Sequence, residues 1–229
     1  MPKIFGLEHI IYLLVVITVF TFTIMFTKKR IKTDKQIAFL IKSLGLLHLA
    51  TIVWNRISIA FGRDDFKQLW PDSFCGTTSL VLSLTVLLFK KNHKILHAVS
   101  YLGLLGGLLT LAYPDFIGQD ESFFYPMTIS GLLHHTFMVL TVLLMLMTGY
   151  LKPTIKNWHI LPICLFMYMT YGLFLITIIG LEDAMYIYEP ILSGTFLNWF
   201  YLGVLFIPIY TVFLLIWEYV QRKSKKVNI

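Results

Sequence analysis

One cysteine stands where a helix is expected to begin, in the run from Pro71 to Thr77 (PDSFCGT). Asp72 or Ser73 can cap that helix, because a short side chain with an oxygen accepts hydrogen bonds from the free amides of a first turn. The thiol of Cys75 then lies at the positive end of the helix dipole. A partly exposed thiolate near a basic group is a competent nucleophile. The alternative is a small apolar filler, the role expected of Cys164.

A pair of histidines, His134 and His135, lies in a later apolar stretch. Neighbouring residues on a helix are about 100° apart, so one imidazole is expected to face the interior of the protein. With Ser130 one turn earlier, His134 can be oriented by a hydroxyl and act as general base toward Cys75. A histidine satisfied by a neighbouring helix and a proton relay are the alternatives. No third ligand at a diagnostic spacing supports a metal site.

Polar residues also recur along the apolar stretch from 37 to 62. His48, Thr51 and Asn55 are spaced at i, i+3 and i+7, and Arg56 follows directly. Such a stripe points toward neighbouring helices, where Arg56 or Asn55 can bind a phosphate or an oxyanion. A buried hydrogen-bonded seam between helices would also explain the stripe. The predicted substrate-binding residues are His48, Asn55, Arg56, His135 and Asn198.

The elements that carry these residues are predicted to cross a membrane. The chain is 57% hydrophobic and 14% charged, and its apolar residues come in blocks of about 20, the length that spans the hydrocarbon of a bilayer. A soluble fold is excluded, because these blocks are apolar around the whole helix. We expect an all-α polytopic bundle of seven transmembrane helices forming one domain over residues 1–229. The predicted helices are 7–27, 37–62, 74–89, 95–113, 127–151, 158–180 and 195–220.

The charged residues alternate between loops, which predicts the orientation. Basic residues gather after the first, third and fifth helices and in the tail: Lys28, Lys29, Arg30, Lys32, Lys35, Lys90, Lys91, Lys94, Lys152, Lys156, Arg222, Lys223, Lys225 and Lys226. The other loops carry mainly Asp64, Asp65, Asp72, Asp115, Asp120, Glu121, Glu182, Asp183 and Glu189. Positively charged loops stay in the cytoplasm, so the N-terminus is expected outside and the C-terminus inside the cell membrane. The net charge of +7 is therefore a topology signal and does not indicate nucleic-acid binding.

Glycines in the fourth predicted helix allow another helix to approach closely. Gly103 and Gly107 form a small-xxx-small pattern with Gly106 beside it. Packing within the chain and dimerisation both fit this pattern, and the sequence gives no oligomeric state. No cofactor is indicated, because the chain has no phosphate-binding glycine loop, no HExxH motif and no paired-cysteine metal motif.

The chain resembles the YwaF-like bacterial integral membrane proteins, which are related to animal seven-helix cysteine acyltransferases acting on ether phospholipids. The resemblance rests on FGLEH (5–9), the run from Pro71 to Cys75, FYPMTISGLLH (124–134), residues 168–174 and EPILSGTFLNW (189–199). It implies a seven-helix bundle and acyl transfer, with Cys75 as the nucleophile and His134 as the histidine of helix five. The chain departs from the family at Asp72, where relatives have leucine, and at Thr170, where they have asparagine.

These observations lead to three hypotheses. The first is a membrane-embedded lipid acyltransferase or acyl hydrolase in which Cys75 attacks an acyl ester, with membrane lipids as partners and a phospholipid as substrate. The second is a carrier or receptor for a small solute or for protons, with a polar pocket inside the membrane. The third is an assembly factor that receives another membrane protein on the glycine face of helix four.

Overall fold

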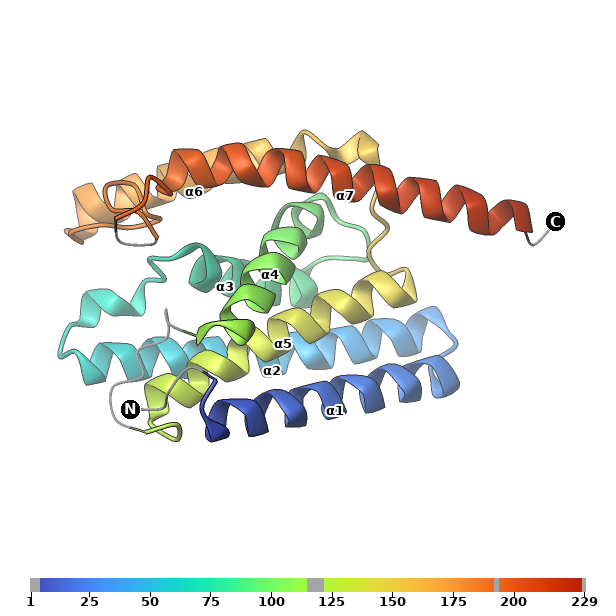
Figure 1. The fold of residues 1–229 in the computed structure, drawn as a ribbon, viewed down its shortest axis with the longest axis horizontal. Coiled ribbons are helices and arrows are strands. Elements are labelled where there is room, and N and C mark those ends of the chain that lie inside the picture. Colours follow the sequence, from blue (N-terminus) through green and yellow to red (C-terminus); the bar gives the residue numbers. More distant parts are fainter. Residues whose placement is uncertain (1–4, 115–121, 192–193, 228–229) are drawn as a thin grey trace.

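The helices follow the apolar blocks of the sequence closely. The computed structural model describes residues 5–114, 122–191 and 194–227. Within these ranges the fold is all-helical with seven main helices, as expected: α1 (Leu7–Arg30), α2 (Asp34–Gly62), α3 (Phe74–Leu88), α4 (Lys94–Ala112), α5 (Pro126–Thr148), α6 (Ile160–Phe174), which continues as a π-helical turn (Leu175–Ile179), and α7 (Trp199–Val227) (Figure 1). Asp115, Asp120 and Glu121 of the acidic loops lie outside the described residues.

The chain is a multi-pass membrane protein. Six helices in the described residues are long and apolar enough to cross a bilayer: α1, α2, α4, α5, α6 with its flanking turns, and α7. α3 has 15 residues and a length of about 22 Å, shorter than the ~30 Å of a hydrocarbon core. The start of α1 and the end of α7 lie at opposite ends of the bundle, as an odd number of passes requires (Figure 1). Which end faces the cytoplasm stays a prediction from charge.

Local capping explains where several helices begin and end. Thr33 and Gln36 form a capping box at the start of α2, and Ser73 accepts a hydrogen bond from the backbone of α3. Gly149 ends α5 in the left-handed conformation, with φ of 69°. The last helix begins at Trp199, later than expected, because Asn198 Oδ1 accepts hydrogen bonds from the amides of the first turn at 3.2 and 3.4 Å.

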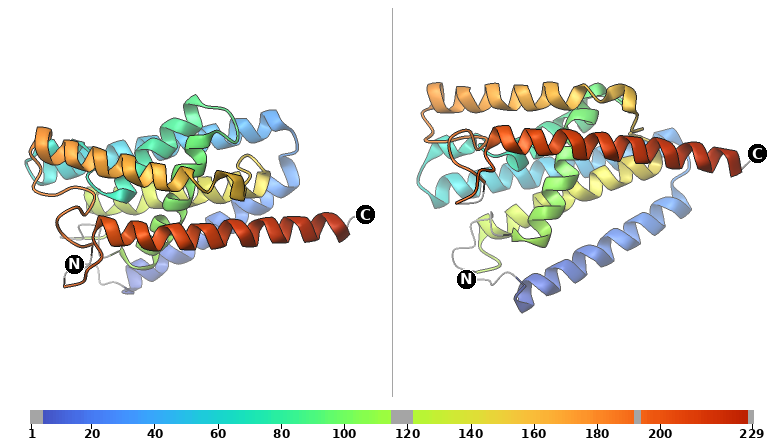
Figure 2. Two further views of the ribbon diagram at one scale, coloured as in Figure 1. Left: turned by 90° about the horizontal axis from the view of Figure 1, so that it is seen from above. Right: turned by 45° about the horizontal axis from the view of Figure 1, so that its top comes forward.

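α5 is the central helix of the bundle. α1 and α2 lie on one side and α6 and α7 on the other, with α3, α4 and α5 between them (Figure 1). α4 crosses the other helices steeply, and α1 runs along the edge of the bundle away from α6 and α7 (Figure 2). Most side chains of α5 are buried on all sides, whereas those of α1 and α7 mostly face outward. Most directions around α5 therefore lead into protein, and Met147, near the end of the helix, is an exposed exception at 40%.

The glycine face of α4 packs inside the chain. A Cβ atom at Gly107 would lie 2.6 Å from Cγ2 of Val139 on α5, and one at Gly103 would lie 3.1 Å from Sδ of Met138. A Cβ atom at Gly106 would lie 2.9 Å from Sγ of Cys75 on α3. The hypothesis that this face receives another membrane protein is therefore wrong, because α3 and α5 already cover it.

Substitution of Gly107 tests this packing. Gly107→Ala places a methyl group against Val139 and is expected to lower the free energy of unfolding by about 1–3 kcal/mol, measured by SDS titration in mixed micelles. Gly203→Ala in α7 is the matched control, because its nearest contact would be 3.7 Å from Leu165 Cδ1. Alanine suits a helix better than glycine, so the control should be neutral or stabilising. Equal effects of the two substitutions would contradict the close approach of α4 and α5.

Candidate functional site

A cavity of about 750 Å³ lies between α2, α3, α4, α5 and α7, and the segment 183–191 closes one side of it together with Leu197. Five of the seven predicted site residues line this cavity: Asn55, Arg56, Cys75, His134 and His135. They come from three helices and are separated by up to 80 positions in the sequence, so only the packing of the bundle brings them together.

Cys75 occupies the first turn of α3. Ser73, one of the two predicted caps, accepts a hydrogen bond from the amide of Gly76 at 3.2 Å. The thiol is partly buried, lies close to the side chain of Thr110 on α4, and lies beside the bare backbone of Gly106. Cys164 on α6 is buried and does not line the cavity. The two cysteines thus differ in access to any molecule that enters the cavity.

His134 is oriented by a hydroxyl, but the residue that supplies it was predicted incorrectly. Nδ1 of His134 lies 3.0 Å from Oγ of Ser79, one turn after Cys75 on α3. Ser130, the predicted partner, instead bonds to Asn55 and to the backbone of its own helix. Ser79 and Cys75 are four residues apart and share a face of α3. The hydrogen bond to Ser79 therefore holds the imidazole against the helix face that carries the thiol. No hydrogen bond in the described residues joins Cys75 to His134 directly.

Both histidines of α5 line the cavity, contrary to the expectation that one faces the interior. Their ring centroids are 4.0 Å apart. Nδ1 of His135 donates to the carbonyl oxygen of Gly131 at 2.7 Å, since a carbonyl can only accept. The expectation was wrong because α5 is central: two directions 100° apart around it both lead into protein.

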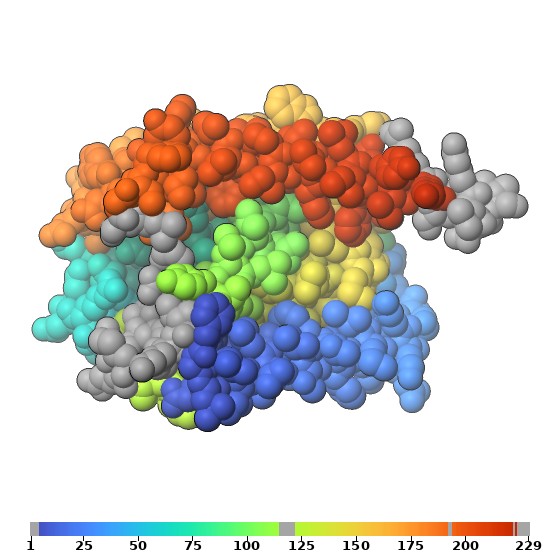
Figure 3. Space-filling model, in the orientation of Figure 1, coloured from blue at the N-terminus to red at the C-terminus, as the bar shows by residue number. Residues whose placement is uncertain are grey.

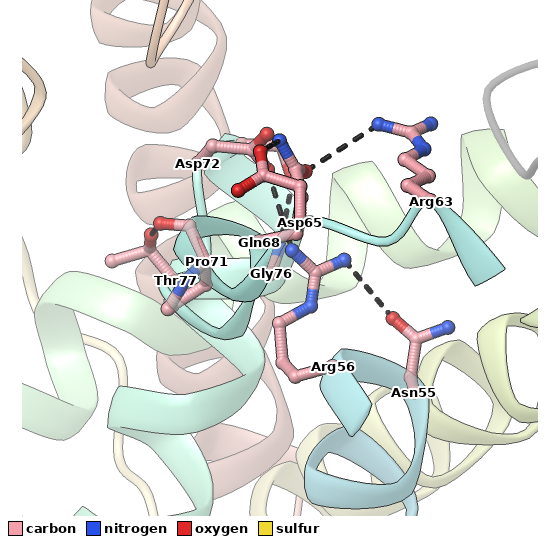
Figure 4. Close-up of polar contacts among 10 residues, drawn as sticks. Asn55, Arg56, Arg63, Asp65, Gln68, Pro71, Asp72, Gly76 and Thr77 are labelled. Atoms are coloured by element: carbon pink, nitrogen blue, oxygen red, sulfur yellow. Dashed lines mark hydrogen bonds and ion pairs between the residues drawn. The ribbon is translucent and has the colours of Figure 1, made fainter. Parts of the chain in front are cut away.

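A chain of polar groups forms one wall of the cavity (Figure 4). Nη1 of Arg56 lies 3.3 Å from Oδ1 of Asp72, and Nη2 donates to Oδ1 of Asn55 at 3.1 Å. The Asn55 amide donates onward to Oγ of Ser130 and to the carbonyl of Met127 at 3.1 and 3.2 Å. The side chains of Arg56 and Asp72 are 13% and 30% exposed, so this pair holds a charge inside the bundle. Asp72, where the chain departs from the resemblance, thus has a partner of its own.

Two predicted residues do not reach the cavity. His48 lies seven residues from Asn55, or about 10 Å along α2, and is fully buried. Neither of its ring nitrogens has a hydrogen-bond partner among the described residues, and it lies near enough to His135 to interact electrostatically. The oxygen of Asn198 is occupied in capping α7. A role for either residue in binding substrate stays a prediction.

The segment that closes the cavity was not predicted. The Asp183 carboxylate accepts hydrogen bonds from the backbone amides of Ile187, Tyr188 and Glu189 at 3.1 to 3.3 Å. The amide of Met185 donates to the backbone oxygen of Asp72 at 2.7 Å, which ties this segment to the ion pair.

Its backbone is strained beside the thiol. Met185 and Tyr186 have φ of 55° and 57°, a conformation that is costly for residues with side chains. Tyr186 stacks on Phe74, the neighbour of Cys75, with ring centroids 6.0 Å apart. Burial raises the pKa of the Tyr186 phenol, so the hydroxyl stays neutral. No local sequence pattern marks this segment as part of the cavity, because the contacts that place it there, from Met185 to Asp72 and from Tyr186 to Phe74, join residues more than 100 positions apart.

The TMEM164 family model matches residues 4–220, which include all the helices that line the cavity. The chain belongs to the TMEM164 family. The match covers nearly the whole chain, and the YwaF-like name stays a resemblance. No curated protein and no solved structure matches the chain.

The Arg56–Asp72 pair can be tested by removing the acid. Asp72→Ala leaves the Arg56 guanidinium buried without its counterion, and we expect the free energy of unfolding in mixed micelles to fall by about 3 kcal/mol. Asp34→Ala is the matched control: its ion pair with Lys91 is exposed to solvent, so its removal should leave the free energy of unfolding almost unchanged. Adding Arg56→Leu to Asp72→Ala should recover part of the loss. Similar small effects of Asp72→Ala and Asp34→Ala would show that the buried pair is not needed.

Proposed function

We propose that this TMEM164-family protein is a membrane-embedded lipid acyltransferase or acyl hydrolase that uses Cys75 as its nucleophile. The observation that carries the proposal is that Cys75 and His134 line one cavity and are linked through the same face of α3, where Ser79 holds the imidazole. Membership of a multi-pass membrane family and the resemblance to cysteine acyltransferases support it. The cavity lies within the bundle, where a phospholipid can enter from the bilayer.

The reaction proceeds in two acyl-transfer steps. The sulfur of Cys75 attacks the carbonyl carbon of an acyl ester while His134 accepts the thiol proton. The bond to the ester oxygen breaks, and that oxygen takes the proton and leaves as an alcohol, so a thioester remains on Cys75. A hydroxyl of a second lipid then attacks the thioester and the thiol is regenerated. Attack by water in this second step makes the protein a hydrolase.

The polar wall places the positive charge of Arg56 beside the substrate, where a lipid phosphate carries negative charge or the tetrahedral intermediate develops it. Arg56 lines the cavity and keeps a buried Nε without a partner in the described residues. In this proposal Arg56 and Asn55 hold the phosphate of the lipid or the oxyanion of the tetrahedral intermediate. Asp72 keeps the guanidinium in place from the other side. By the charge pattern of the loops, this end of the cavity belongs to the outer half of the cell membrane.

Substitution of the two cysteines tests the nucleophile. Cys75→Ala should abolish acyl release from a phospholipid with a labelled acyl chain, assayed in phosphatidylethanolamine and phosphatidylcholine vesicles. The native protein should form a hydroxylamine-sensitive acyl adduct at Cys75, detected by mass spectrometry. Cys164→Ala is the matched control and should keep both properties, because Cys164 lies outside the cavity. An adduct at Cys164, or full turnover by Cys75→Ala, would contradict the proposal.

Substitution of Ser79 tests how His134 is held. His134→Gln should lower kcat by about 10²–10⁴-fold, as loss of a general base does. Ser79→Ala should lower kcat by a smaller factor with little change in KM, because the base remains but loses its partner. Ser83→Ala, on the same helix, is the control: its hydroxyl bonds to its own backbone and should leave kcat unchanged. An unaffected kcat in Ser79→Ala would exclude a positioning role.

A second candidate function, a proton-coupled carrier or receptor, is favoured by one observation. His48 is fully buried, has no hydrogen-bond partner among the described residues, and lies near the His134–His135 pair. The imidazoles of His48, His134 and His135 can pass a proton from one to the next. Among the described residues, no group of three possible ligands could hold a metal ion. The two functions separate experimentally. pH-dependent solute uptake into vesicles that changes in His134→Ala but not in Cys75→Ala would favour the carrier.

A further inference from the structure

A second, smaller cavity of about 170 Å³ lies between α4, α6 and α7. Its walls are almost entirely aliphatic and aromatic, and they include Tyr101, Leu102, Leu105, Leu108, Phe206 and Tyr210. We call it the α4–α7 slot. No charged side chain in the described residues lines it, so it has nothing with which to bind a polar ligand.

The slot continues the cavity that contains Cys75. Leu102 of α4 and Phe206 of α7 line both spaces. Leu102 lies one helical turn before Gly106, the residue whose bare backbone faces the Cys75 sulfur. A molecule with a reactive group at the thiol and a long apolar tail can therefore extend from one space into the other.

One end of the slot is closed by aromatic rings. The rings of Tyr101 and Tyr210 have centroids 4.8 Å apart, and the ring of Phe213 lies 5.4 Å from Tyr101. The hydroxyl of Tyr101 lies 3.3 Å from Nδ1 of His97, which holds the ring in position. Tyr101 is five residues from Gly106, so the rings lie at least ~7 Å along α4 from the level of the thiol.

The slot also opens sideways toward lipid. Leu108 and Ile209, which line it, are 47% and 53% exposed. α4 reaches the surface of the molecule directly beside α7 (Figure 3). An apolar chain in the bilayer can therefore enter between these helices without crossing a polar surface.

We propose that the α4–α7 slot binds one acyl chain of a glycerolipid, with the ester at Cys75 and the tail between α4 and α7. The proposal rests on the acyl-transfer function above and deepens it by naming the part of the substrate that the protein recognises. A helix of a second chain does not fit, since one turn of a helix about 10 Å wide occupies about 400 Å³, more than twice the volume of the slot, about 170 Å³. Tyr101 and Tyr210 then limit the length of the chain that is accepted.

Photo-crosslinking tests the occupant without requiring turnover. The full chain is reconstituted in phosphatidylcholine vesicles that contain a phosphatidylcholine with a diazirine near the end of one acyl chain, and crosslinked residues are identified by mass spectrometry. Crosslinks should concentrate on slot residues of α4 and α7. Leu105→Trp should reduce them by about tenfold, because the larger indole occupies the space that the acyl chain would fill. Leu14→Trp on the lipid-facing side of α1 is the matched control and should leave them unchanged.

A widening substitution keeps the test informative if Leu105→Trp does not fold. Leu105→Ala should retain the crosslinks and shift the preferred substrate toward longer or bulkier acyl chains. Two results would show that the slot holds only bulk lipid and would overturn the proposal. One is crosslinks that spread equally over the slot and the outer face of α1. The other is crosslinks that do not change in a folded Leu105→Trp protein.

The failure of this inference and that of the proposed function can be told apart. If Cys75→Ala abolishes turnover but Leu105→Trp changes neither crosslinking nor chain-length preference, the slot inference is wrong and the nucleophile stands. If Cys75→Ala keeps full turnover while crosslinks still map to the slot and disappear in Leu105→Trp, the nucleophile is wrong and the lipid site stands.

Discussion

The close approach of α4 to α3 and α5 is the contact on which the rest of the site depends. In lipid, apolar surface gains little by leaving the solvent, so helices associate through tight packing and polar contacts. Three glycines within five residues of α4 allow this approach, and Gly106 leaves room for the Cys75 sulfur. A side chain there would push α4 away and separate the thiol from Thr110. The position of α4 also determines the slot, which α4 forms together with α7.

Polar contacts determine how α2 and the connecting segments pack around α3, α4 and α5. A buried charge in a membrane must be paired, and Arg56 is paired both with Asp72 ahead of α3 and with Asn55 on its own helix. Asn55 bonds on to α5 through Ser130, and the backbone of Asp72 receives the segment that closes the cavity. One network therefore joins α2, α5 and two connecting segments. The same groups that satisfy the buried charge form the polar wall of the cavity, so stability and the proposed binding role depend on the same residues.

Much of the candidate site could be predicted because residue types that are costly in lipid are few. Arg56, Asn55, Cys75 and His134 stand out from apolar helices, and the structure places them around one cavity. Their contacts could not be predicted. Ser79 holds His134 where Ser130 was expected, because the distance from α3 to α5 depends on how the helices cross. Asn198 caps a helix because α7 begins four residues later than its hydropathy indicates.

By itself, the sequence determined the helices of this protein and their membrane character. Hydropathy and capping are local: the free energy of placing a segment in lipid depends on that segment alone, so bounds such as 74–89 for α3 agree with Phe74–Leu88 to within a residue. Only the tertiary structure decided which polar groups meet, that both histidines of α5 reach the cavity, and that an apolar slot continues it. Those outcomes depend on crossing angles and helix rotations, which are set by contacts between residues far apart in the chain.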